Sequence, residues 1–163
     1  MLDFILNINN ESLKIIFISM LPITELRFSI PYFILQDNVM WQKVLILSIL
    51  GNIMIGLLVL YIIAPLMLFL KKNYYLHRII SYILKRTKSK SRIIDNYKML
   101  GLILFVGIPL PFTGVWTGAL ASYLFSIPRK KSMLSIIVGV LVSSAIVLSL
   151  TFIGIEIVDI LKT

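Results

Sequence analysis

The sequence predicts an all-α integral membrane protein built as an inverted repeat, in which a re-entrant helical hairpin followed by a transmembrane helix occurs twice. Two observations predict this class. Hydrophobic residues make up 59% of the 163 residues and charged residues only 14%, whereas a soluble domain has roughly 45–50% apolar and about 25% charged residues. Along the chain, two long charge-free runs alternate with two apolar segments that proline and glycine interrupt near the middle.

The first interrupted segment, residues 13–36, predicts the first re-entrant hairpin. It contains Pro22 and Pro31, with the charged Glu25 and Arg27 between them. Proline removes a helical hydrogen bond and clashes with the preceding turn, so we do not expect one straight helix. A helical arm of about ten residues is about 15 Å long, which is half of a hydrocarbon core of about 30 Å. Such an arm reaches the middle of the membrane and stops there.

Residues 41–70 and 132–156 predict the two transmembrane helices. Each contains a charge-free run that exceeds the roughly 20 residues needed to cross the hydrocarbon core. Trp41 stands where an interfacial anchor is expected, and Pro65 predicts a kink. Small residues recur every four positions in both helices, which predicts close helix packing. These stripes are Ser48, Asn52 and Gly56 in the first helix and Ser135, Gly139 and Ser143 in the second.

Residues 74–98 predict a basic amphipathic linker on the cytoplasmic side. The net charge of +9 arises from 16 basic and 7 acidic residues, and the bases are concentrated in this part of the chain. Cytoplasmic loops of membrane proteins collect lysine and arginine in this way, so the charge does not call for nucleic acid as a partner. Apolar residues share one helical face of the linker, which predicts a helix lying against anionic membrane lipids.

The second interrupted segment, residues 99–128, predicts the second re-entrant hairpin. The basic linker precedes it, and three further bases at 129–131 follow it. A spanning helix would put these two basic clusters on opposite sides of the membrane, against the positive-inside tendency. A hairpin that enters and leaves on the cytoplasmic side keeps both inside. The first hairpin then begins and ends outside, so the two halves of the chain have opposite orientations. A chance match of two proline-broken segments is the alternative interpretation.

Two hairpin tips that meet at the middle of the membrane predict a transport site. A charge at membrane depth costs several kcal/mol, so the pair Glu25 and Arg27 indicates function. We expect Arg27 to hold an anionic group, since guanidinium matches carboxylate and phosphate, and Glu25 to couple transport to protons. Alternatively, the pair only pins the hairpin tip. We also expect Pro22, Thr24 and Asn52 to contribute to this site.

The second tip contributes proline, glycine and threonine. Non-helical backbone is tolerated at membrane depth only where it is buried in protein or lines a wet cavity. A helix that starts near Thr113 or Thr117 would direct its positive N-terminus at such a cavity. A packed hinge without a ligand is the alternative. The residues expected to form this part of the site are Pro109, Pro111, Thr113, Gly114, Thr117 and Gly118.

The composition excludes several kinds of chemistry. The chain has no cysteine, which excludes disulfides, thiol catalysis and thiolate metal sites, and the lone His77 cannot build a histidine metal site. A carboxylate pair, a Ser-His constellation and a phosphate-binding Gly-Lys-Thr motif are all missing. We therefore expect no metal, no cofactor and no enzymatic activity.

Two motifs identify a family resemblance. PITELRFSIP at residues 22–31 is followed, after the basic linker, by GIPLPFTGVWTGAL at residues 107–120. Together they resemble the family of small multidrug export proteins, and the likeness covers nearly the whole chain. The resemblance implies a prokaryotic membrane protein and, more distantly, kinship with the DedA/VTT superfamily, whose members are described with two re-entrant hairpins and linked to lipid scrambling or undecaprenyl-phosphate translocation.

The resemblance also assigns residues. It maps the acidic and basic motif residues of the family onto Glu25 and Arg27. It maps the proline-glycine breaker of the family onto Pro109, Pro111, Gly114 and Gly118. Phe28-Ser29 stands where the family has smaller residues, and this departure would narrow the site.

These observations together predict a small, multi-pass transporter of the prokaryotic cell membrane, either an exporter or a lipid-carrier flippase. Its expected substrate is an anionic or amphiphilic small molecule or a lipid phosphate. We expect a homodimer, because one protomer offers little protein to shield the hairpins from lipid. Two alternatives stay open, namely a non-transporting assembly or scaffold protein and an intramembrane lipid-phosphate enzyme.

Overall fold

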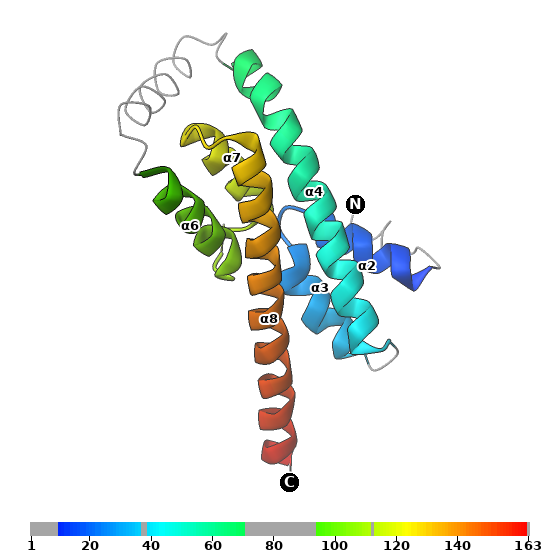
Figure 1. Ribbon diagram of the computed structural model, residues 1–163. Coiled ribbons are helices and arrows are strands. Elements are labelled where there is room, and N and C mark those ends of the chain that lie inside the picture. Colours follow the sequence, from blue (N-terminus) through cyan, green and yellow to red (C-terminus); the bar gives the residue numbers. More distant parts are fainter. Residues whose placement is uncertain (1–9, 37–38, 71–93, 112, 163) are drawn as a thin grey trace.

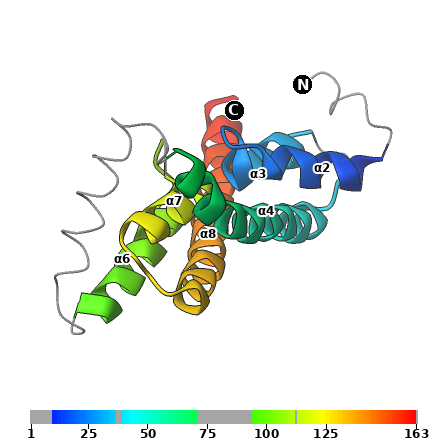
Figure 2. The same ribbon diagram turned by 90° about the horizontal axis from the view of Figure 1, so that it is seen from above.

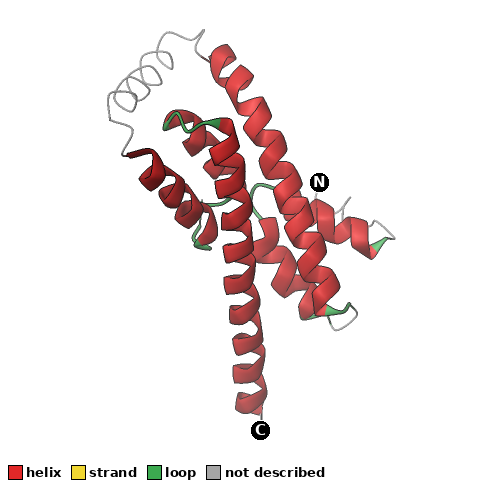
Figure 3. Ribbon diagram, in the orientation of Figure 1, coloured by secondary structure: helices red, strands yellow, loops and turns green. Residues whose placement is uncertain are grey.

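The protein is helical throughout the part of the chain that the computed structural model describes, residues 10–36, 39–70, 94–111 and 113–162. Figure 3 shows helices joined by loops, with no strand among these residues. The predicted all-α class is therefore confirmed. In chain order, the helices are α2 (Glu11–Met20), α3 (Glu25–Ile34), α4 (Trp41–Leu70), α6 (Ile94–Gly107), α7 (Val115–Leu124) and α8 (Arg129–Lys162).

Each of the two interrupted segments forms a pair of short helices, as predicted. The first pair, α2 and α3, is separated by residues 21–24, which include Pro22. The second pair, α6 and α7, is separated by residues 108–114, which include Pro109 and Pro111. Proline fixes its own φ and lacks an N–H, so it ends a helix where no neighbouring element compensates. Pro31, by contrast, lies inside α3, and the break in the first segment occurs only at residues 21–24.

The two charge-free runs form the long helices α4 and α8, and both are long and apolar enough to cross a membrane. The α4 helix has the predicted bounds and continues through Pro65. The α8 helix is longer than the predicted 132–156, since it begins at Arg129 and ends at Lys162. The α6 helix begins at Ile94, within the predicted linker of residues 74–98. The predicted amphipathic helix of the linker lies mostly outside the described residues.

Large apolar side chains are exposed along both long helices. Met54 on α4 is 57% exposed and Leu134 on α8 is 55% exposed, and many residues of both helices are similar. A soluble monomer rarely exposes a continuous apolar surface of this kind. This surface is suited to contact with lipid chains.

The α8 helix lies between the two hairpins. Figure 2 shows α6 and α7 on one side of α8 and α2 and α3 on the other, with α4 packed against α2, α3, α7 and α8. In Figure 1, α4 and α8 run in opposite directions, and α6 and α8 begin at the same end of the molecule. The two hairpins point toward each other, so that residues 21–24 and 108–114 meet near the middle of α4 and α8.

Glycine and serine allow the long helices to approach the hairpins closely. A Cβ at Gly51 of α4 would lie 2.7 Å from the carbonyl oxygen of Ile16 and 2.2 Å from Oγ of Ser19, both on α2. A Cβ at Gly139 of α8 would lie 2.7 Å from Cβ of Val106 on α6. The residues of both small-residue stripes are buried, including Asn52 at 1% exposure. The stripes predicted from the sequence are therefore packing surfaces.

Replacement of Gly51 tests this packing. G51A should lower the free energy of unfolding by about 1–3 kcal/mol, because the new methyl group overlaps the α2 backbone. The measurement is thermal denaturation of the purified protein in detergent micelles. G101A is the matched control, since no atom lies within 4 Å of its added Cβ and alanine favours a helix over glycine by about 1 kcal/mol. Equal midpoints for the two variants would contradict the close approach of α4 and α2.

Candidate functional site

The two hairpin tips enclose a pocket of about 480 Å³, here called the tip pocket. Both tips and the starts of α3 and α7 contribute to its walls. Two of its lining residues are charged, and the others are apolar or carry a hydroxyl or an indole group. The residues that line the tip pocket are Pro22, Ile23, Glu25, Arg27, Pro109, Leu110, Pro111, Thr113, Trp116 and Thr117.

Glu25 joins the first hairpin to the start of α7. Its side chain is only 6% exposed, and its carboxylate lies within reach of hydrogen bonds from the backbone N–H groups of Val115 and Trp116. These are the first two residues of α7, whose N–H groups have no acceptor within their own helix. A carboxylate at a helix N-terminus is stabilised both by these hydrogen bonds and by the helix dipole. Glu25 therefore acts as the N-terminal cap of a helix from the other hairpin.

Gly114 makes room for this carboxylate. A Cβ at Gly114 would lie 2.2 Å from Oε2 and 2.6 Å from Oε1 of Glu25, so any larger residue would displace the acceptor. Gly114 also has a φ of 133°, a conformation that residues with a side chain rarely adopt. Two independent constraints, the backbone angle and the space for Glu25, thus require glycine immediately before α7.

The backbone of Glu25 is in an unusual conformation. Its φ is 48°, in the left-handed region that costs an L-residue roughly 1–2 kcal/mol. Such a conformation persists only where the surrounding contacts determine it. Here the turn between α2 and α3 directs the Glu25 side chain at the start of α7, and the hydrogen bonds from α7 offset the cost.

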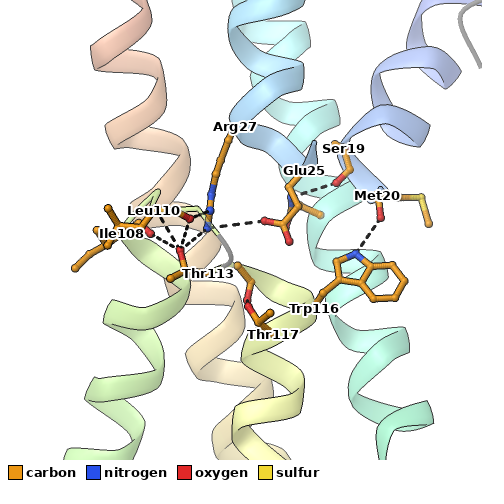
Figure 4. A network of polar contacts seen from close by, with 11 residues as sticks. Ser19, Met20, Glu25, Arg27, Ile108, Leu110, Thr113, Trp116 and Thr117 are labelled. Atoms are coloured by element: carbon orange, nitrogen blue, oxygen red, sulfur yellow. Dashed lines mark hydrogen bonds and ion pairs between the residues drawn. The ribbon is translucent and has the colours of Figure 1, made fainter. Parts of the chain in front are cut away.

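Arg27 binds the second tip (Figure 4). Its guanidinium donates hydrogen bonds to the carbonyl oxygen of Leu110 and, through Nη2 at 3.0 Å, to Oγ1 of Thr113. Nη2 also lies 3.9 Å from Oε2 of Glu25. The Thr113 hydroxyl in turn lies 2.9 Å from the carbonyl oxygen of Ile108 and 2.8 Å from that of Leu110, so it holds the turn of the second tip together.

One donor of Arg27 is left over. Its Nε is buried and has no hydrogen-bond partner among the described residues. A buried guanidinium N–H without an acceptor is costly, and Arg27 lines the tip pocket. The Arg27 side chain as a whole is 19% exposed, but Nε itself is enclosed by protein.

Two further hydrogen bonds close the first tip. The indole Nε1 of Trp116 donates to the carbonyl oxygen of Met20 at 3.1 Å, which links α7 to the end of α2 (Figure 4). Thr24 donates through Oγ1 to the carbonyl oxygen of Ile18 at 2.6 Å. The first contact satisfies the carbonyl of Met20 at the end of α2, and the second adds to the hydrogen bond that the carbonyl of Ile18 accepts from the N–H of Leu21.

The structure brings most of the predicted site residues together. Seven of those predicted line the tip pocket: Pro22, Glu25, Arg27, Pro109, Pro111, Thr113 and Thr117.

Four predicted residues have other positions. Gly114 lies against the Glu25 carboxylate, and Thr24 closes the first tip. Asn52 lies outside the pocket, where its Nδ2 donates to the carbonyl oxygen of Ser19 at 3.2 Å. Gly118 is a packing glycine, since an added Cβ would lie 2.5 Å from Cγ2 of Val106. The α7 helix begins between Thr113 and Thr117. Its first N–H groups already have the Glu25 carboxylate as an acceptor, so they are not available to a ligand.

Sequence reasoning missed three lining residues, Ile23, Leu110 and Trp116. Trp116 and Leu110 belong to the second motif, and Ile23 to the first, but none has a group that suggests a ligand contact by itself. Their position within the two motifs was the available signal. Leu110 acts through its backbone carbonyl, which no residue type reveals.

Metal-ligand geometry is not found at the site. Among the described residues, no three His, Cys, Asp or Glu side chains are close enough together to hold a metal ion. The chemistry that the tip pocket offers is ion pairing, hydrogen bonding and apolar contact.

Comparison with known proteins identifies one family. The family model described as "Putative small multi-drug export protein" matches residues 25–146, which begin at the buried carboxylate of the first tip and include the whole second hairpin. The comparisons with curated proteins and with solved structures found no match.

Removal of the Glu25 carboxylate tests its capping role. E25A should lower the free energy of unfolding by about 1–3 kcal/mol, because two buried N–H groups lose their acceptor. Thermal denaturation in detergent micelles measures the effect, with E156A, at an exposed position of α8, as the control. If E25A and E156A unfold at the same temperature, Glu25 does not cap α7.

Proposed function

The chain belongs to the small multi-drug export protein family, and we propose that it is a transporter whose substrate site is the tip pocket. An export protein carries a solute and does not transform it, so the pocket is treated as a binding site. We place α4 and α8 across the prokaryotic cell membrane in opposite directions, with both hairpins re-entrant. The end that bears residues 129–131 faces the cytoplasm in this arrangement, in agreement with the positive-inside tendency.

The observation that carries the proposal is the pair Glu25 and Arg27 in the wall of the tip pocket. Ionisable residues at membrane depth are costly, and they mark substrate and ion pathways. Broken helices at matching positions of two halves are a further pointer to a transport site. A purely structural pair would need no pocket beside it, whereas this pair borders about 480 Å³ of space.

The composition of the pocket supports an amphiphilic substrate with an anionic group. The guanidinium of Arg27 in the pocket wall offers charge-assisted N–H donors, which carboxylate and phosphate groups accept well. The prolines, Ile23 and Leu110 form apolar walls around it. A small amphiphilic anion and the head group of a lipid phosphate share this chemistry, so both an exporter and a lipid-carrier flippase are consistent with the pocket.

We further propose that Glu25 couples transport to protons. As a carboxylate, Glu25 accepts from the N–H groups of Val115 and Trp116. A proton that binds to it removes the charge and one acceptor position, so the link between the first hairpin and α7 weakens. The tips then separate more readily, and return of the proton to water restores the link. One titrating group thus biases two arrangements of the hairpins.

Replacement of Arg27 tests the site. R27A should lower the transport rate about tenfold to 100-fold, which corresponds to the loss of a charge-assisted hydrogen bond of about 1.5–3 kcal/mol, and R27K should retain part of the activity. Proteoliposomes are assayed with carboxyfluorescein, ethidium and a fluorescent phosphatidic acid, which represent an amphiphilic anion, an amphiphilic cation and a lipid phosphate.

The matched control is K43A, which removes an exposed base at the start of α4. It should transport like the unmodified protein. If R27A moves every probe at the unmodified rate while it inserts normally, the tip pocket is not the substrate site.

Replacement of Glu25 by its neutral isostere tests proton coupling. In inverted vesicles with an acidic lumen, the unmodified protein should accumulate its probe faster than it does without a pH gradient, because protons leave through the protein. E25Q should show the same rate with and without the gradient, since residue 25 no longer titrates. E156Q should respond like the unmodified protein. A gradient response that survives in E25Q would assign coupling to another group.

A further inference from the structure

The tip pocket continues into a groove between α3 and α8. A second pocket of about 320 Å³ shares Arg27 and Pro109 with the tip pocket. A third pocket, of about 600 Å³, shares Pro31, Leu150 and Thr151 with the second. The third pocket extends along α8 as far as Asp159. Through these shared residues, the three pockets adjoin one another in a row from the hairpin tips toward the C-terminal end of α8.

We propose that this α3–α8 groove is the route by which the substrate passes between the tip pocket and the membrane face at the C-terminal end of α8. In Figure 1, that end lies opposite to the starts of α6 and α8. With residues 129–131 in the cytoplasm, the groove leads to the outer face, as the exit of an exporter must. The use of the groove by a substrate rests on the proposed function, whereas its course rests on the shared lining residues.

Pro31 and Thr151 lie at the junction of the two outer pockets. They belong to both outer pockets, one from α3 and one from α8. Pro31 has no N–H to donate to the carbonyl of Arg27, one turn earlier in α3, so a backbone acceptor is left near the groove. The Thr151 hydroxyl bonds to its own helix at 2.8 Å, to the carbonyl oxygen of Val147, and its side chain is buried. Beyond this point, an added Cβ at Gly154 would meet no atom within 4 Å.

The groove is suited to an amphiphile. Arg27 stands at its inner end and Asp159 at its outer end, and most of the wall between them is apolar, with Ile34, Leu150 and Val158 among its residues. An anionic head group is attracted to the inner end and repelled at the outer end. This distribution of charge retains the head group at Arg27.

The opposite end of the tip pocket is closely packed. A Cβ at Gly56 of α4 would lie 3.0 Å from Cβ of Val115 at the start of α7. Between α6 and α7, Gly118 faces Val106 with similarly little room. The apolar pocket at the outer surface of these two helices, with Lys98, Leu102 and Phe105 in its wall, shares no residue with the tip pocket. Among the described residues, the packing is therefore closer around α6 and α7, whereas the row of pockets leads toward the C-terminal end of α8.

Cysteine accessibility tests the route, because the chain has no cysteine of its own. T117C reports on the tip pocket, and T151C reports on the junction of the two outer pockets. E156C and K130C mark the two membrane faces. Each variant is treated with a membrane-impermeant methanethiosulfonate reagent in right-side-out and in inverted vesicles, and the modified fraction is normalised to total thiol after denaturation. T117C and T151C should react about tenfold faster from the face that modifies E156C, which corresponds to about 1.4 kcal/mol of preference.

A second substitution blocks the groove itself. G154W, combined with T117C, should slow modification of T117C by about tenfold and lower transport in the same proportion. G101W fills open space at the other end of the molecule and should change neither. Reaction of T117C only from the face that modifies K130C, or from neither face, overturns the route, and so does unchanged modification in the presence of G154W. If transport depends on Arg27 but not on Gly154, the route is wrong and the proposed function stands. If the labelling pattern is as expected but no probe moves, the proposed function fails while the groove remains open.

Discussion

The carboxylate of Glu25 caps α7 from the opposite hairpin, and the meeting of the two hairpin tips depends on this contact. Three unusual features of the backbone make this contact possible. Glu25 has a left-handed φ of 48°, Gly114 has a φ of 133°, and Gly114 has no Cβ where the carboxylate lies. Each is unfavourable or restrictive by itself. Together they bring one acceptor to two buried N–H groups that would otherwise have none, and this exchange is favourable because an unsatisfied buried N–H is costly.

The charge on Glu25 is balanced within a few ångströms. Nη2 of Arg27 lies 3.9 Å from Oε2 of Glu25 and also bonds to the second tip. A buried charge is tolerated only where hydrogen bonds and an opposite charge replace the water that it has lost. Because the two side chains come from one hairpin and their hydrogen-bond partners from the other, these hydrogen bonds exist only while the tips are together. Any motion that separates the tips must therefore supply new partners, such as a proton for Glu25 and an anionic substrate for Arg27.

The long helices form the frame in which these tips can meet. Small residues at Gly51 and Gly139 bring α4 to the backbone of α2 and α8 to the side chains of α6. Helix association within a membrane relies on such close packing, since lipid chains are as apolar as the helices. The frame is thus tight around the arms of the hairpins, while the space that the pockets occupy lies at the tips and along α3 and α8. This difference in packing separates the closely packed arms of the hairpins from the part of the protein that contains the pockets.

Much of this architecture was predictable from local sequence. Runs without charge exceed the width of a hydrocarbon core, and prolines at 22, 109 and 111 interrupt helices because they lack an N–H. Glu25 and Arg27 stood out as charges in an apolar segment. These features depend on residue type and on neighbours along the chain, so they can be recognised without a structure.

The pairing of the two tips was decided only by tertiary structure. The acceptor for the first N–H groups of α7 belongs to a residue some ninety positions earlier in the chain. The sequence predicted that these groups would face an anionic ligand, whereas they face the carboxylate of Glu25. Leu110 takes part through a backbone carbonyl, and Gly118 and Asn52 serve packing between helices. The sequence by itself thus determined a helical membrane protein with two broken hairpins and a charged tip. Tertiary structure alone decided which charge meets which backbone group and where the pocket opens. Those contacts join segments that lie far apart in the chain, and no periodic pattern of residues relates one segment to the other.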